Sequence, residues 1–92
     1  MTFHPEHEPL HGITVVVTGA SGRTYLGRYH ERTPRGVLLH DAGIHDPASA
    51  AHSLDEWLRR QHQFGIRVEQ RALLVPADEA GLVVPFTEAL QA

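Results

Sequence analysis

Residues 15–27, with the sequence VVVTGASGRTYLG, decide the fold of this 92-residue chain because they fit two mutually exclusive structures. A β-branched strand followed by a glycine turn opens a nucleotide-binding β-strand–helix–β-strand unit, in which the turn cradles phosphate. The same residues also fit a strand, a four-residue turn and a second strand, which together form a β-hairpin. The segment that follows the turn distinguishes the two structures.

Residues 23–32 favour the hairpin. As a strand, they place Tyr25, Gly27 and Tyr29 on one face, and threonine and tyrosine suit a pleated surface. As a helix, they would hold Gly27 in the interior at a cost of about 1 kcal/mol and offer only a short apolar stripe. Asp41 lies near where a dinucleotide-binding fold has its ribose-binding acid, but 92 residues are too few for the second half of that fold. We therefore predict a strand and keep a three-stranded βαβαβ unit as the α/β alternative.

The rest of the chain predicts three further strands and one helix, which gives a mainly β fold. Residues 13–18 and 36–42 read as the first and third strands, and residues 66–75 and 82–86 as the fourth and fifth. A helix is predicted over about 53–64, because Ser53 and Glu56 match a capping box and Gly65 can end the helix. Residues 1–11 read as a flexible His-rich arm before a single domain, residues 12–92.

This pattern of strands and glycines resembles the Sm-like proteins, which belong to the SH3-like small β-barrels. Residues 13–18, the glycine turn, residues 23–28 and residues 36–42 look like their first three strands, and residues 73–76 with 81–86 look like the last two. The resemblance implies a five-stranded SH3-like (Sm-like) barrel with one helix inserted before strand 4, and ring-type assembly. It implies RNA binding less well, because residues 31–36 lack the Asp and Asn of the RNA-binding members and the chain has no lysine for their Tyr-Lys-His segment.

The missing residue types exclude several classes of enzyme. The chain has no Cys and no Lys, so it lacks a thiol nucleophile, a P-loop lysine and a Schiff-base amine. It also has no Asn, and this bias against AT-rich codons indicates a GC-rich, bacterial genome. No apolar run approaches the roughly 20 residues of a membrane span, and we expect a cytoplasmic protein without membrane contact.

Two sets of polar residues are candidates for chemistry or binding. His40-Asp41 and His45-Asp46 invite comparison with metal-dependent phosphohydrolases, but neighbouring strand residues point to opposite faces and cannot share a ligand cage without a bulge. Histidines 4, 7 and 11 with Glu6 and Glu8 could bind a divalent ion, but a mobile arm is not preorganised for it. We therefore predict no metal site, no cofactor and no catalytic residues.

Arginines around two tyrosines form a candidate nucleic-acid face. Tyrosine rings could stack on bases while guanidinium groups bind phosphates. The alternative is that the tyrosines pack in the core and the arginines are solvated, and the net charge of -3 favours it. The candidate residues are Tyr25, Arg28, Tyr29, Arg32 and Arg35.

Apolar edge strands around residues 67–75 and 82–86 predict self-association, because unpaired edges of this kind must be covered. The predicted function is a non-enzymatic, self-assembling interaction or scaffold module. A nucleic-acid-binding Sm-like protein and a nucleotide-binding βαβ domain are the alternatives. The predicted interface residues are Trp57, Val68, Leu73, Val75, Leu82, Val84 and Phe86.

Overall fold

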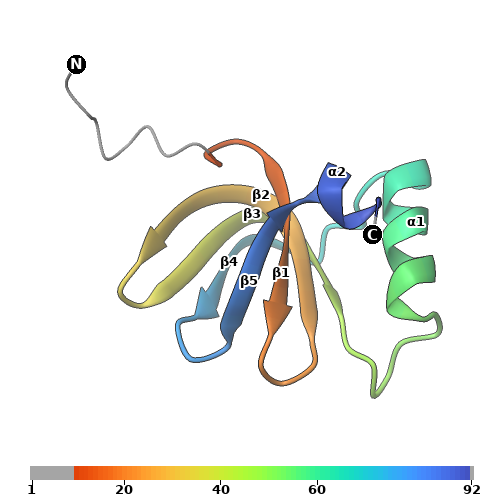
Figure 1. The fold of residues 1–92 in the computed structure, drawn as a ribbon, viewed down its shortest axis with the longest axis horizontal. Helices are drawn as coiled ribbons and strands as arrows, with labels where there is room; N and C mark the ends of the chain where they lie inside the picture. The colour runs from red at the N-terminus through yellow and green to blue at the C-terminus, as the bar shows by residue number, and fades with distance from the viewer. Residues whose placement is uncertain (1–9, 92) are drawn as a thin grey trace.

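A computed structural model describes residues 10–91, which form one antiparallel sheet of five strands and two helices (Figure 1). Across the sheet the strand order is β4-β3-β2-β1-β5, so β4 and β5 are its two edges and the sheet is open. Along the chain the elements are β1 (Thr14–Gly19), β2 (Thr24–Thr33), β3 (Gly36–His45), α1 (Leu54–Phe64), β4 (Gln70–Pro76), β5 (Ala80–Pro85) and α2 (Phe86–Ala89).

The predicted mainly β fold, with one helix before the fourth strand, is confirmed. The α/β alternative is wrong, because the segment after the glycine turn is β2, a strand of ten residues, and β2 is antiparallel to both of its neighbours. A helix at this position could not have paired with β1 on one side and β3 on the other, as β2 does. The glycine turn is therefore the turn of a hairpin.

A bulge in β3 explains why this strand is longer than predicted. Between Leu26 and Arg28 of β2, the register to β3 shifts by one residue, and Asp41 adopts a positive φ of 51° at this point. The extra residue shifts the alternation of side chains by one position, so that Ala42 and Ile44 face the same side as Val37 and Leu39. The strand consequently continues to His45 instead of leaving the sheet after Ala42.

One face of the sheet, here called the inner face, carries a single hydrophobic core to which all five strands contribute. Leu73 of β4 and Val83 of β5 both pack against it, although β4 and β5 are at opposite edges of the sheet. The sheet must therefore curl strongly to bring its edges towards each other. Leu10 also packs there; residues 1–9 of the predicted arm lie outside the described residues. The buried core residues are Val15, Val17, Tyr25, Tyr29, Val37, Leu39, Ala42 and Val75.

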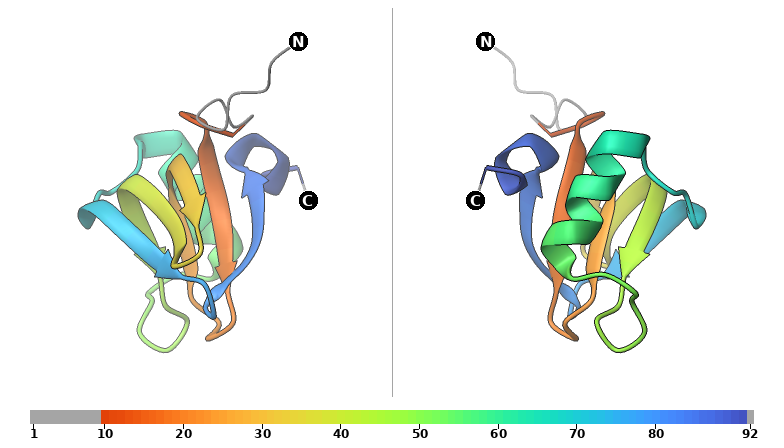
Figure 2. Two further views of the ribbon diagram at one scale, coloured as in Figure 1. Left: turned by 90° about the vertical axis from the view of Figure 1, so that its left-hand side faces the viewer. Right: turned by 90° about the vertical axis from the view of Figure 1, so that its right-hand side faces the viewer.

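The opposite face of the sheet is covered by α1, and we call it the helix face (Figure 2). Leu58 of the helix packs with Val16 and Leu26 of the sheet, and all three are buried. The Ser53 hydroxyl accepts the N–H of Glu56 at 3.2 Å, as the capping pattern predicts, and Gly65 ends the helix with a φ of 91°. Within residues 10–91, neither helix is long and apolar enough to cross a membrane.

Candidate functional site

The glycine turn between β1 and β2 holds a carboxylate of the protein itself. The N–H of Ser21 donates to Glu79 Oε1 at 2.9 Å, and the Ser21 hydroxyl donates to Glu79 Oε2. The N–H of Ala20 donates to the main-chain carbonyl of Glu79 at 2.8 Å. A Cβ atom on Gly19 would overlap the Glu79 carboxylate and would lie 2.7 Å from the Arg23 carbonyl oxygen, so a side chain there would displace the carboxylate and strain the backbone. The turn that looks like a phosphate cradle in the sequence is thus occupied by the turn before β5.

Tyr25 completes this group, which we call the Glu79 latch: Ser21, Tyr25 and Glu79. The Tyr25 hydroxyl donates to Glu79 Oε2 at 2.8 Å. The hydrogen bonds from Ser21 and Tyr25 lower the pKa of Glu79 below its usual value. Burial, followed by the hydrogen bond to Glu79, raises the pKa of Tyr25. A charged carboxylate and a neutral phenol thereby tie the β1–β2 turn to the β4–β5 turn.

The candidate nucleic-acid residues do not share one surface. Tyr25 and Tyr29 are only 7% and 4% exposed and belong to the inner core, so their rings offer no free face for a base. Arg28 donates to Asp41 at 2.8 Å. Arg32 and Arg35 are exposed near the β2–β3 turn, and neither forms an ion pair with another residue in the described range. Of the three arginines in the candidate set, Arg32 and Arg35 therefore have no ion-pair partner among the described residues.

Most of the predicted interface residues pack against other residues of the same chain. Val75 is fully buried in the inner core, so it is not available to a neighbouring copy. Four others are half-buried. Leu73 packs against the inner core, and Trp57, Val84 and Phe86 pack on the helix face.

Exposed apolar side chains nevertheless remain on or beside both edge strands. Leu82 of β5 is 71% exposed and Val68, which precedes β4, is 45% exposed, as the prediction requires. Leu74 of β4 is 41% exposed and was missed. Its neighbours Leu73 and Val75 point inwards, and strand alternation then places Leu74 outside.

The two His-Asp pairs are divided among separate contacts. Asp41 binds Arg28, and Asp46 accepts from Arg23 Nε at 3.1 Å. His45 is buried, and its Nε2 donates to the carbonyl of His52 at 2.8 Å. In residues 10–91, no three His, Cys, Asp or Glu side chains are grouped to hold a metal ion.

The sequence did not predict a cavity that lies beside residues 66–69, where β4 begins four residues later than expected. The fourth strand was expected from residue 66, but residues 66–69 lie outside the sheet ladder and β4 begins at Gln70. Ile66 instead packs on the helix face, and the carbonyl of Arg67 passes close to Gly43, where a Cβ atom would be only 3.0 Å away. The last residues of β3 consequently have a neighbouring strand on the β2 side alone.

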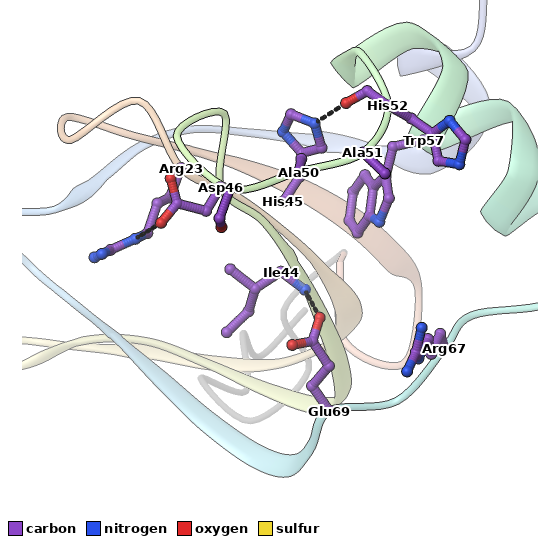
Figure 3. A pocket seen from close by; sticks show the side chains of 11 residues that line it. Arg23, Ile44, His45, Asp46, Ala50, Ala51, His52, Trp57, Arg67 and Glu69 are labelled. Carbon is purple, nitrogen blue, oxygen red and sulfur yellow. Dashed lines mark hydrogen bonds and ion pairs between the residues drawn. The ribbon is translucent and has the colours of Figure 1, made fainter.

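The cavity has a volume of about 510 Å³ and opens beside Ile44 and Trp57 (Figure 3). Arg23 and Asp46 lie on one side of it in this view and Arg67 on the other. The N–H of Ala48 and the guanidinium of Arg23 lower the pKa of Asp46, which keeps this ion pair charged. The lining residues are Arg23, Ile44, His45, Asp46, Ser49, Ala50, Ala51, His52, Trp57, Arg67 and Glu69.

Sequence patterns gave no signal for this cavity, and its residue Trp57 was predicted only as part of the interface between copies. Trp57 lies on the helix face, and its ring centroid is 5.5 Å from that of His45. The other lining residues come from three separate segments, which only the fold brings together: Arg23, residues 44–52 and residues 67–69. No protein-family model matches this chain and no curated protein is detectably similar to it, so the fold and these surfaces alone carry its functional interpretation.

Proposed function

We propose that this protein is a non-enzymatic interaction module of the SH3-like or Sm-like small-barrel type that assembles by pairing its edge strands. The observation that carries the proposal is the pair of unpaired edges, β4 and β5, at the two ends of one curled sheet. An unpaired edge presents a row of free backbone N–H and C=O groups to a second strand. Pairing β4 of one copy with β5 of the next would satisfy both rows at once.

The arrangement of the core supports the barrel-like part of the proposal. Val75 of β4 and Val83 of β5 contribute to the same inner core, and the Glu79 latch ties the turn between these strands to the β1–β2 turn. The two edges are therefore held in fixed positions by contacts within the subunit. Fixed edges suit repeated pairing between copies, because little conformational entropy is lost on association.

The exposed apolar residues support the self-association. Leu74 on β4 and Leu82 on β5 are both exposed. Their neighbours Leu73 and Val83 pack on the inner face, so strand alternation places both leucines on the helix face of the sheet. Side chains on the same face of two paired strands become cross-strand neighbours, and apolar pairs of this kind stabilise a sheet. Pairing of β4 with β5 would thus cover two leucines that face water in the single copy.

The test is the mass of the protein in solution, measured by light scattering over a range of concentrations. We expect a multiple of the 10.2 kDa chain mass for the wild type and a shift towards that mass for Leu82→Glu. Phe64→Glu is the matched control, because Phe64 is 72% exposed but lies at the end of α1, away from both edge strands. A wild type that stays at 10.2 kDa at every concentration, or a Phe64→Glu variant that dissociates equally, contradicts the proposal.

A further inference from the structure

The cavity beside Trp57 exposes backbone hydrogen-bonding groups of β3. Ile44 pairs with Tyr25 of β2 in the register, but its N–H donates to the Glu69 side chain, Oε2, at 2.9 Å. In an antiparallel strand, the N–H and C=O of one residue point to the same side. The Ile44 carbonyl therefore also faces the cavity, and no residue in the range 10–91 donates a hydrogen bond to it. This free strand edge is one residue long, because the Ala42 carbonyl before it accepts from the Glu69 N–H and the Asp46 carbonyl after it accepts from Ser49 and Ala50.

The walls of the cavity combine apolar surface with two arginines and two carboxylates, of which Arg67 has no ion-pair partner among the described residues. Trp57, Ala50 and Ala51 supply apolar contact area. Arg23, on the far side, is matched by Asp46. The second carboxylate is that of Glu69, which accepts a hydrogen bond from the Ile44 N–H (Figure 3).

We propose that this cavity is a docking notch for an extended acidic peptide segment of a partner protein. The segment adds as a short strand beside Ile44, so that a backbone carbonyl accepts from the Ile44 N–H and a backbone N–H donates to the Ile44 carbonyl. An apolar side chain of the segment packs against Trp57, and a neighbouring carboxylate pairs with Arg67. A small ligand would not need the paired donor and acceptor that the strand edge offers.

In the free protein, the Glu69 carboxylate takes the place in the notch that a peptide carbonyl would take. It satisfies the Ile44 N–H and must leave when a peptide carbonyl takes that place. It also repels an acidic segment. We therefore expect Glu69→Gln to bind acidic peptides more tightly than the wild type does, whereas a site for basic ligands would lose affinity with this change.

The experiment is a selection of random heptapeptides displayed on phage, followed by affinity measurements on the enriched peptides. We expect enrichment of sequences in which apolar and acidic residues alternate. Their affinity should fall about tenfold for Arg67→Glu, because an attraction becomes a repulsion. Arg35→Glu is the matched control: it makes the same charge change at an exposed position near the β2–β3 turn and should leave the affinity unchanged.

Amide NMR shifts locate the bound peptide, with the largest change expected at the Ile44 N–H. The proposal is overturned by a selection that enriches nothing, by equal affinity for the wild type and Arg67→Glu, or by shifts confined to β4 and β5. Complete competition by free succinate would also overturn it, since it indicates a site for small anions. Repeating the measurement on Leu82→Glu separates this notch from self-association, because the notch needs no second copy.

Discussion

Glu79 connects two turns whose residues are 58 positions apart in the sequence. Its carboxylate accepts hydrogen bonds from the Ser21 main chain, the Ser21 side chain and Tyr25. The sequence indicated a glycine turn able to surround an anion, and it did not indicate which anion. Nothing in the local pattern around Glu79 distinguishes it from the neighbouring Asp78, because the difference depends on the pairing of β1 with β5, which places Ala80 opposite Gly19.

Glu79→Gln should destabilise the protein near neutral pH and weaken its response to acid. The hydrogen bonds lower the pKa of Glu79 in the folded state, so this carboxylate stabilises the fold above its unfolded pKa of about 4.3, and the stabilisation is lost as the pH falls. Urea unfolding at about pH 7 and about pH 3 should therefore show a smaller loss of stability in Glu79→Gln than in the wild type. Asp78→Asn removes an exposed charge from the same turn and should behave like the wild type. Equal acid sensitivity of Glu79→Gln and the wild type contradicts the latch.

Gly36 makes the β2–β3 turn depend on the absence of a side chain. Its φ is 147°, and a Cβ atom would overlap the carbonyl oxygen of Val75 in β4. We expect Gly36→Ala to lower the free energy of unfolding by roughly 3 kcal/mol, from backbone strain and the displaced strand together. Gly65→Ala is the control, since Gly65 also has a positive φ but has no atom within 4 Å of the added methyl group. If both variants lose the same stability, the overlap with Val75 contributes nothing.

Helix α1 was predictable from the sequence, whereas the start of β4 was not. The signals of the helix are local. Ser53 caps its start, Gly65 ends it, and the apolar stripe of Leu54, Trp57 and Leu58 packs on the sheet. Residues 66–69 carry the alternation of a strand, but tertiary packing overrides it because Ile66 is taken up by the helix face. The cavity and the free edge of β3 exist because residues 66–69 leave the sheet, so local sequence patterns could not predict them.

Leu58 should carry most of the attachment of α1 to the sheet. It is the one helix residue of α1 that is buried, and it packs on Val16 and Leu26. Leu58→Ala should therefore cost about 2–4 kcal/mol in the free energy of unfolding, as for other buried leucines. Phe64→Ala, in the last turn of the same helix, removes a side chain that is 72% exposed and should change the stability little. Denaturant unfolding measures both, and equal losses would show that the helix is held elsewhere.

At the scale of the whole molecule, the two edges are chemically different, and this determines which assemblies can close. Pairing β4 with β5 is heterologous, so an open assembly of any length has a free β4 at one end and a free β5 at the other until a ring closes. Pairing β4 with β4, or β5 with β5, is isologous and stops at a dimer. The proposal of β4–β5 pairing can therefore be tested by blocking each edge separately.

Leu74→Glu blocks β4 and Leu82→Glu blocks β5, and both positions are exposed enough for the monomer to tolerate the charge. Under β4–β5 pairing, each variant alone should remain monomeric, because every contact it can make contains one buried glutamate. An equimolar mixture should form a heterodimer, in which the intact β5 of the first variant pairs with the intact β4 of the second. Native mass spectrometry distinguishes the two variants by mass and counts the copies in each complex. A homodimer of Leu82→Glu alone would mean instead that β4 pairs with β4, and the ring would have to be abandoned.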